Sequence, residues 1–175
     1  MSKNYVDNKK FYQEISTYLE KLEKSKEEGT NPPKIPEYIG YAIFKIAENL
    51  STMRRFIGYS YRDEMISDGI ENCFLYLHNF DHRKYTNPFA YFTRIVYFAF
   101  VRRIKAEQKE QYVRQKSMMN SYILNSDPHL NNLLDSQDFL KANEVIEKFE
   151  TKVEEKKKEK KNKNAVTTIL DLQEE

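Results

Sequence analysis

Apolar residues recur three or four positions apart along most of this chain, the spacing of one helix face. Between Lys9 and Glu28 they lie on a charged background, which predicts an amphipathic helix that packs on the body of the domain. Gly29 is the expected C-terminal stop of this helix. Three prolines between Pro32 and Pro36 predict a stiff connector. A separate partner-binding arm is the alternative interpretation of the first helix.

A second apolar stripe follows Pro36 and predicts a helix of about five turns that ends at Gly58. Its members are Ile39, Ile43, Ile46, Leu50, Met53 and Ile57. Arg54 and Arg55 fall near the end of this helix, where cations complement the helix dipole. We interpret the two arginines as a solvated helix end rather than as a nucleic-acid contact.

A third helix is predicted to begin near Arg62 or Asp63. Its expected apolar stripe is Met65 or Ile66, Ile70, Cys73 or Phe74, and Leu77, and its opposite side carries Glu64, Ser67, Asp68 and Glu71. An acidic side of this kind is usually a solvated face. Gly69 in mid-helix costs about 1 kcal/mol relative to alanine. Its presence suggests close approach by another helix or by a partner.

The fourth predicted helix follows a polar turn at residues 79–87. Asn87 is the expected cap and Pro88 the first helical residue. The expected buried stripe is Phe89, Phe92, Ile95 or Val96, and Ala99 or Phe100. Ten of the chain's 24 aromatic residues lie between Phe74 and Phe100, more than one stripe can bury. We therefore expect some of these rings to meet a partner.

The rest of the chain is more polar. The fourth helix could continue to Asp127–Pro128, and a further amphipathic helix is predicted from Leu130 to Phe149. Residues 154–164 contain no apolar side chain, so they are either disordered or a fraying, solvated helix. The last residues turn apolar again, which favours a short linear docking motif. A segment that folds back on the domain, or a tail without function, is the alternative.

Composition agrees with an all-α protein, because glycine is scarce and β-branched runs are absent. The net charge of +2 hides a local asymmetry: residues 82–116 carry nine lysines and arginines against two acids. A local excess of positive charge is the electrostatic footprint of an anionic partner. Rings and arginines on one helix suit single-stranded nucleic acid, because bases stack on rings while guanidinium groups hold phosphates.

Several classes of protein are disfavoured. Cys73 is the single cysteine, and no apolar run approaches the roughly 20 residues of a membrane span, so we expect a cytoplasmic protein. The three histidines do not form a metal-binding spacing, and the chain has neither a phosphate-binding glycine loop nor a catalytic motif. We expect no enzyme, no metal and no cofactor.

Three ordered blocks resemble region two of the bacterial sigma factors: EMISDG at residues 64–69, NFD at 79–81 and PFAYFT at 88–93. Most of the chain from Asn4 to Arg114 resembles the small late-transcription sigma factors of T-even-type bacteriophages, in phrases such as EMISDGIE, LHNFD, KYTNPFAY and VRRIK. The tandem tryptophans of the family are Arg94 and Ile95 here.

This resemblance implies a small helical sigma region-two-like domain with a flexible C-terminal tail. Residues 1–36 would be an N-terminal helix and proline-rich connector, 37–116 the core, 117–153 an accessory helical segment, and 154–175 a charged linker and docking tail. The implied function is that of a late-gene sigma factor in an infected bacterial cell. It would bind host core RNA polymerase, recognise an AT-rich minus-ten late promoter element and support promoter opening.

The resemblance also implies which residues bind each partner. The coiled coil of the largest polymerase subunit would contact Glu64, Ser67, Asp68, Glu71 and Phe74. Promoter DNA would contact Phe80, Arg83, Lys84, Tyr85, Tyr91, Arg94, Tyr97, Arg102, Arg103 and Lys105. Among these, Phe80 and Tyr91 correspond to the pocket that stacks a flipped non-template adenine, and Lys84 to a phosphate-holding residue. Charge reversal at Asp68 is expected to abolish polymerase association while leaving the fold intact.

The C-terminal sequence TILDL resembles the clamp-binding tail of the same family. The resemblance implies that Ile169, Leu170 and Leu172 bind the replication sliding clamp and that a late-transcription co-activator takes part. Two other functions remain open. One is a helical adaptor whose aromatic helix packs a homodimer, and the other is a sequence-tolerant single-stranded DNA-binding protein of phage replication.

Overall fold

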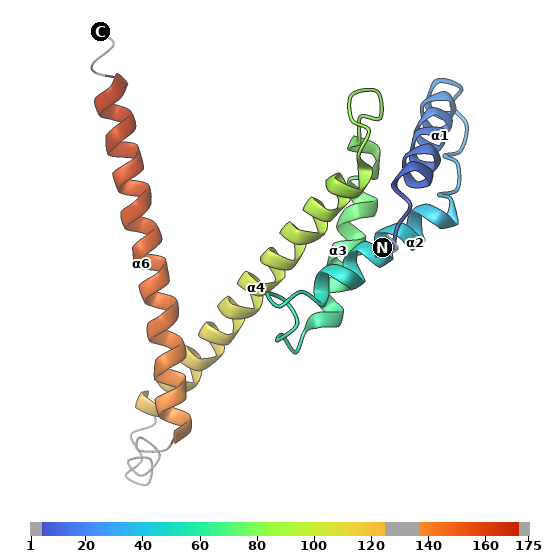
Figure 1. Ribbon diagram of the computed structural model, residues 1–175. Helices are drawn as coiled ribbons and strands as arrows, with labels where there is room; N and C mark the ends of the chain where they lie inside the picture. The colour runs from blue at the N-terminus through green and yellow to red at the C-terminus, as the bar shows by residue number, and fades with distance from the viewer. Residues whose placement is uncertain (1–4, 125–136, 172–175) are drawn as a thin grey trace. The chain divides into compact units, whose positions relative to one another are not determined.

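The structure, a computed structural model, describes residues 5–124 and 137–171 (Figure 1). Over these ranges it contains helices and no strand, which confirms the all-α prediction. The elements are α1 (Asn8–Glu27), α2 (Glu37–Ser51), α3 (Arg62–Leu75), the short 3₁₀ helix η1 (Leu77–Asn79), α4 (Pro88–Leu124) and α6 (Gln137–Asp171). No helix in these two ranges is long and apolar enough to cross a membrane.

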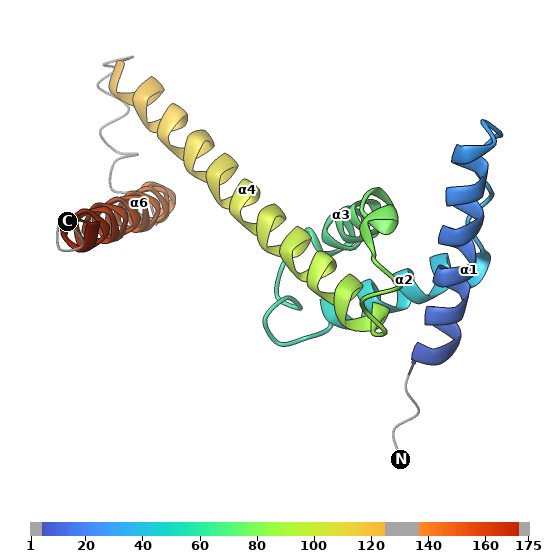
Figure 2. The same cartoon turned by 90° about the horizontal axis from the view of Figure 1, so that it is seen from above.

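The chain divides into two compact units, Met1–Ile104 and Lys105–Glu175. In the first unit, α1, α2, α3, η1 and the start of α4 share one hydrophobic core. Figure 2 shows the ribbons of these helices from above. Within the described residues, every buried hydrophobic side chain except Ala142 belongs to this unit. The first unit therefore contains nearly all of the apolar burial that stabilises the fold.

Helix α1 begins and ends as its sequence predicts. The Asp7 carboxylate accepts a hydrogen bond of 2.9 Å from the backbone N–H of Lys9. Gly29 has a φ of 66°, and the N–H of Thr30 donates to the Ser25 carbonyl at 2.9 Å, the long bond of a Schellman motif. The apolar face of α1 is buried in the first unit. The expectation that this helix packs on the body of the domain is confirmed.

Helix α2 is shorter than predicted. Its stripe is buried as far as Leu50, but the helix ends at Ser51, and Met53 and Ile57 are exposed. The hydroxyls of Ser51 and Thr52 donate to the carbonyls of Glu48 and Asn49, at 2.6 Å and 2.8 Å. Such bonds compete with the helical ladder. The prediction of five turns was wrong because it extended the apolar period past these hydroxyls.

Helix α3 buries Met65, Gly69 and Cys73. Of the predicted alternatives, Met65 rather than Ile66 and Cys73 rather than Phe74 therefore face the core. A Cβ atom at Gly69 would lie 3.0 Å from Val96 Cγ1 of α4. The close approach that Gly69 suggests is therefore to another helix. The Cys73 thiol lies 3.9 Å from the Phe92 carbonyl, and burial raises the pKa of this thiol to about 12.

Helix α4 starts at the predicted cap, since the Asn87 side-chain oxygen accepts a hydrogen bond of 3.1 Å from the N–H of Ala90. Phe92, Val96, Ala99 and Phe100 are buried, whereas Phe89 and Ile95 are half-buried. Val96 rather than Ile95 is therefore the buried member of the first predicted pair, whereas Ala99 and Phe100 of the second pair are both buried. The helix continues beyond Lys105 to Leu124.

In the second unit, the later half of α4 contacts α6. The rings of Tyr112 and Phe149 stack with centroids 4.4 Å apart, and the Tyr112 hydroxyl donates to Glu150 at 3.0 Å. Lys116 also donates to Glu150. The hydrogen bonds from Lys116 and Tyr112 hold the pKa of the Glu150 carboxyl below its usual range.

The charged run at 154–164 is helical within α6, which is the second of its two predicted alternatives. Ile169 and Leu170 belong to the backbone of α6, and their side chains lie outside the described residues, as does Leu172. Asp127–Pro128 and the predicted helix start at Leu130 also lie outside them.

Candidate nucleic-acid interface

The turn between η1 and α4 presents cations and a ring. The Asp81 carboxylate accepts backbone hydrogen bonds from Arg83 at 3.0 Å and Lys84 at 3.2 Å, which fixes the turn. The side chains of Arg83, Lys84 and Tyr85 are exposed as a result. The Lys84 amine lies 5.4 Å from the centre of the Tyr85 ring. All three residues belong to the DNA-binding set that the sequence predicts.

Phe80 and Tyr91 lie together, as the sequence suggests, but at different depths. Phe80 is only 2% exposed and belongs to the hydrophobic core, with its ring centroid 5.2 Å from that of Tyr91. Tyr91 is half-buried, and its hydroxyl donates to the Tyr76 carbonyl at 3.1 Å. Burial raises the pKa of Tyr91. The more accessible ring of the pair is that of Tyr91, and Phe80 supports it from the core.

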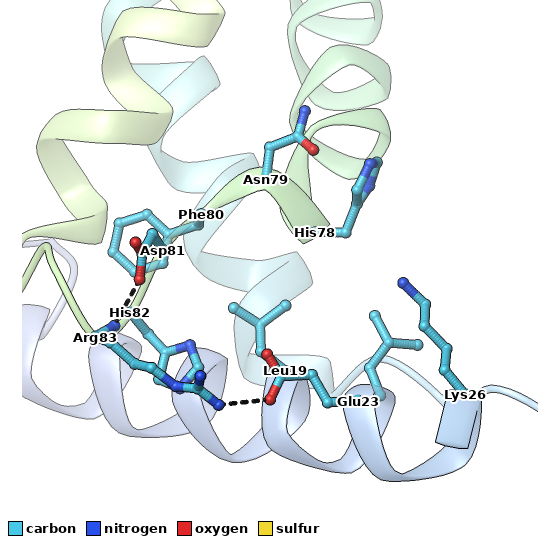
Figure 3. A pocket seen from close by; sticks show the side chains of 10 residues that line it. Leu19, Glu23, Lys26, His78, Asn79, Phe80, Asp81, His82 and Arg83 are labelled. Carbon is cyan, nitrogen blue, oxygen red and sulfur yellow. Dashed lines mark hydrogen bonds and ion pairs between the residues drawn. The ribbon is translucent and has the colours of Figure 1, made fainter. Parts of the chain in front are cut away.

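A pocket of about 390 Å³ lies between α1 and the segment from η1 to the turn (Figure 3). Arg83 donates to Glu23 across it at 2.8 Å, and the Tyr12 hydroxyl donates to the His82 carbonyl at 2.9 Å. Its lining residues are Leu19, Leu22, Glu23, Lys26, His78, Asn79, Phe80, Asp81, His82 and Arg83. The sequence did not predict this pocket, because residues on its two sides, such as Glu23 and Arg83, are 60 positions apart in the chain and share no local pattern.

The outer surface of α4 in the first unit carries Arg94, Phe98 and Arg102, all exposed and spaced four residues apart. Side chains at this spacing are neighbours on one helix face. The Arg94 guanidinium lies 5.7 Å from the centre of the Phe98 ring, and Arg102 donates to the Asn72 side chain at 2.7 Å. Lys105 is exposed at the start of the second unit. Phe98 is a ring that the predicted set did not include.

Tyr97 is half-buried beside this surface and holds an arginine from another segment. Arg55 donates to the Tyr97 hydroxyl, and its guanidinium carbon lies 5.6 Å from the centre of the Tyr97 ring. Arg55 therefore contacts α4 and does not lie at the solvated helix end that the sequence predicts. This long-range contact spans 42 residues of sequence.

The acidic side of α3 is only partly free. Glu64, Ser67 and Glu71 are exposed, and Phe74 is exposed near the end of the helix. Asp68 is half-buried and forms a two-point ion pair with Arg103, with distances of 2.7 Å to Nε and 2.8 Å to Nη2. The structure thus joins a residue expected to bind polymerase to a residue expected to bind DNA.

The arrangement is suited to binding, since cations and rings face outward beside a buried core. Over the described parts of the chain, no group of three or more His, Cys, Asp or Glu residues is placed to hold a metal ion. In comparisons with known proteins, neither a protein-family model nor a curated protein matches this chain.

Proposed function

We propose that this protein is a late-gene sigma factor that binds host core RNA polymerase and directs it to AT-rich minus-ten promoters. The observation that carries the proposal is a pair of surfaces on one core: an exposed acidic strip on α3, and an exposed basic and aromatic surface on the turn and α4. The two helices touch at Gly69, which fixes the positions of the surfaces relative to each other.

The acidic strip suits a basic helical partner such as the polymerase coiled coil. Glu64 and Glu71 lie seven residues apart, two helical turns, on the exposed side of α3. Ser67 lies between them, and Phe74 adds an exposed ring at the end of the strip. Charges of one sign on a surface raise the rate and specificity of association with an oppositely charged partner.

The turn and α4 suit a promoter strand that leaves the duplex. Lys84 and Arg94 offer exposed cations for phosphates, and Arg83 can do so when it leaves its exposed ion pair with Glu23. Tyr85 and Tyr91 offer rings for bases. Flipping a base out of the stack costs a few kcal/mol, and stacking on an aromatic ring returns about 1–3 kcal/mol per base. Opening of the duplex would thereby become part of promoter recognition. Phe80 would contribute by supporting Tyr91 from below.

Arg102 and Arg103 would have different roles on the upstream duplex. Arg102 is exposed and can turn from Asn72 to a phosphate. Arg103 contributes a DNA contact only after it leaves Asp68. In this proposal the C-terminal residues Ile169, Leu170 and Leu172 couple the complex to the sliding clamp, which rests on the resemblance of the TILDL sequence alone.

The first test is co-elution of the full chain with purified bacterial core RNA polymerase on a sizing column. Asp68 is a poor position for charge reversal, because an arginine there would face Arg103 and disturb the fold. We therefore choose the double variant Glu64→Lys/Glu71→Lys, whose two side chains are exposed. It should lose co-elution while its circular dichroism and melting temperature stay unchanged.

The matched control is Glu20→Lys/Glu27→Lys, which reverses two exposed acids at the same seven-residue spacing on α1. This variant should co-elute like the unmodified chain. The proposal fails if the unmodified chain does not co-elute with core polymerase. The assignment of the α3 surface fails if both double variants bind equally well.

A single-stranded DNA-binding protein is the second candidate. The exposed ring–cation pairs Lys84–Tyr85 and Arg94–Phe98 favour it, because such pairs stack bases and hold phosphates without regard to sequence. This function predicts tight, salt-sensitive binding of single strands without polymerase. Fluorescence anisotropy with a labelled oligonucleotide separates the candidates, since a sigma factor alone should bind it weakly.

A further inference from the structure

The turn that joins α2 to α3, residues 52–61, exposes two large apolar side chains on either side of a buried one. Met53 is 55% exposed and Ile57 is 59% exposed, whereas Phe56 between them is 1% exposed. The Phe56 ring packs edge-on against Phe100, with centroids 5.2 Å apart, and against Tyr97 at 5.8 Å. The turn is therefore anchored at its centre to α4, with both aliphatic side chains outside the core.

The backbone of this turn is held in one shape. The N–H groups of Phe56 and Ile57 both donate to the Met53 carbonyl, at 2.8 Å and 3.0 Å. A surface that is already ordered loses little conformational entropy on binding. Two aliphatic side chains that are exposed on an ordered turn do not stabilise the isolated protein, because water contacts most of their apolar area.

The charge of the turn indicates the chemistry of its partner. Residues 52–61 contain Arg54 and Arg55 and no acid. Arg54 is exposed and, within the described part of the chain, forms no ion pair or hydrogen bond. Arg55 lies against Tyr97, beside the α4 helix that carries Arg94 and Arg102. Apolar side chains in a turn whose only charged residues are cations are complementary to a polyanion with apolar interior faces.

We propose that the 52–61 turn contacts promoter duplex, with Met53 and Ile57 as an apolar wedge against a base step and Arg54 on a phosphate. Proteins that bend or open DNA place methionine and isoleucine against base steps in this way and hold the adjacent backbone with cations. This inference rests on the proposed function and adds a contact that is absent from the predicted DNA-binding set. The wedge lowers the barrier to strand separation, because a partly unstacked step opens more easily.

The test uses the full chain bound to core polymerase and two DNA probes. One probe is a fully paired duplex with an AT-rich minus-ten element, and the other has the same sequence with a permanently mismatched bubble. Strand opening is followed by permanganate reactivity of thymines, and binding is measured over a range of salt concentrations. Association with polymerase is checked first by co-elution.

The double variant Met53→Ser/Ile57→Ser should reduce opening of the paired probe by about fivefold or more, the effect of losing one stacking-type contact. It should bind the bubble probe like the unmodified chain, because that probe needs no opening. The variant Arg54→Gln should make the plot of log affinity against log salt concentration less steep by about one unit of slope, as expected for one lost phosphate contact.

Leu140→Ser is the matched control, since Leu140 on α6 is 59% exposed, the same as Ile57. It should change neither readout. All substituted side chains are exposed, so the melting temperature of each variant should match that of the unmodified chain.

A photo-crosslinking amino acid at position 53 identifies the partner directly. Crosslinking to the duplex is expected, and crosslinking to a polymerase subunit instead would overturn the inference. Normal co-elution together with unchanged opening and salt slopes would overturn this inference and leave the proposed function standing. Absence of co-elution by the unmodified chain would overturn both.

Discussion

Asp68 and Arg103 are the residues at which the two candidate surfaces meet. Each is half-buried, and both guanidinium contacts reach the same carboxylate. Because the carboxylate neutralises Arg103, neither side chain presents a free charge to a partner. The proposed polymerase surface then depends on Glu64 and Glu71, and the proposed duplex surface depends on Arg94 and Arg102.

A double-mutant cycle measures the strength of this pair. Asp68→Asn and Arg103→Gln should each destabilise the fold, with a coupling energy of about 1–2 kcal/mol, between the values for exposed and fully buried pairs. Urea unfolding of the two single variants and the double variant gives the coupling. The exposed pair Lys148–Glu144 is the control and should give less than about 0.5 kcal/mol. Equal coupling energies in the two ion pairs would contradict the expectation that partial burial strengthens the Asp68–Arg103 pair.

Gly69 provides a residue-scale test of the contact between α3 and α4. A Cβ atom there would meet Val96 at 3.0 Å and Phe100 at 3.1 Å, in a packed core. Gly69→Ala should therefore destabilise the protein, because overpacking of about 1–3 kcal/mol exceeds the roughly 1 kcal/mol gained in helix propensity. The melting temperature should fall.

Gly40→Ala is the matched control in α2. The nearest atom to its new Cβ would be Phe74 Cζ at 3.9 Å, an ordinary contact. The propensity gain remains, so this variant should be stabilised by about 0.5–1 kcal/mol. The same substitution should thus have opposite signs at the two glycines. A stabilised Gly69→Ala variant would show that α3 and α4 are not closely packed.

At the scale of elements, the cap of α4 decides where the turn ends and the helix begins. The Asn87 side chain accepts from Ala90, and Pro88 occupies the position where a missing N–H has no cost. The same cap ends the turn that carries Arg83, Lys84 and Tyr85. Loss of the cap should therefore affect both the stability of the fold and the proposed DNA-binding surface.

Asn87→Ala should lower the free energy of unfolding by about 1 kcal/mol, the usual contribution of an N-cap. Chemical denaturation checks this value. Asn120→Ala, at an exposed interior position of the same helix, should be neutral or slightly stabilising, since alanine is the better helix former. A similar decrease in the free energy of unfolding for both variants would mean that the Asn87 side chain does not act as a cap.

At the scale of the whole molecule, the two units differ in how much apolar surface they bury. Within the described residues, the first unit contains all buried hydrophobic side chains except Ala142. The contact between α4 and α6 in the second unit includes the Tyr112–Phe149 stack and the hydrogen bonds to Glu150. A unit whose described residues bury so little apolar surface is expected to open at a lower free energy.

Hydrogen exchange followed by mass spectrometry should detect this difference. Amides of α6 should exchange faster than those of α2, because opening of α6 exposes little apolar surface. Phe149→Ala should accelerate exchange in residues 137–159 and leave α2 unchanged, since the stack lies in the second unit only. Protection of α6 equal to that of α2 would contradict this account.

Local sequence determined the helical class, the caps and the core-facing side of most helices. Gly29, Asn87 and Pro88 act through their own backbone geometry and near neighbours, so their roles follow from their positions in the chain. The apolar period identified the buried stripe of α1 and of α2 as far as Leu50 for the same reason. An anionic partner could be inferred from local charge alone, and this inference stays a prediction.

Tertiary structure alone decided which side chains are available to a partner. Periodicity gives the side of a helix on which a residue lies, but it cannot give what covers that side. Phe80 is therefore buried beneath Tyr91, Arg103 is paired with Asp68 across 35 residues of sequence, and Met53 and Ile57 remain outside the core. Each outcome depends on contacts between segments distant in the chain, whose packing no local pattern encodes.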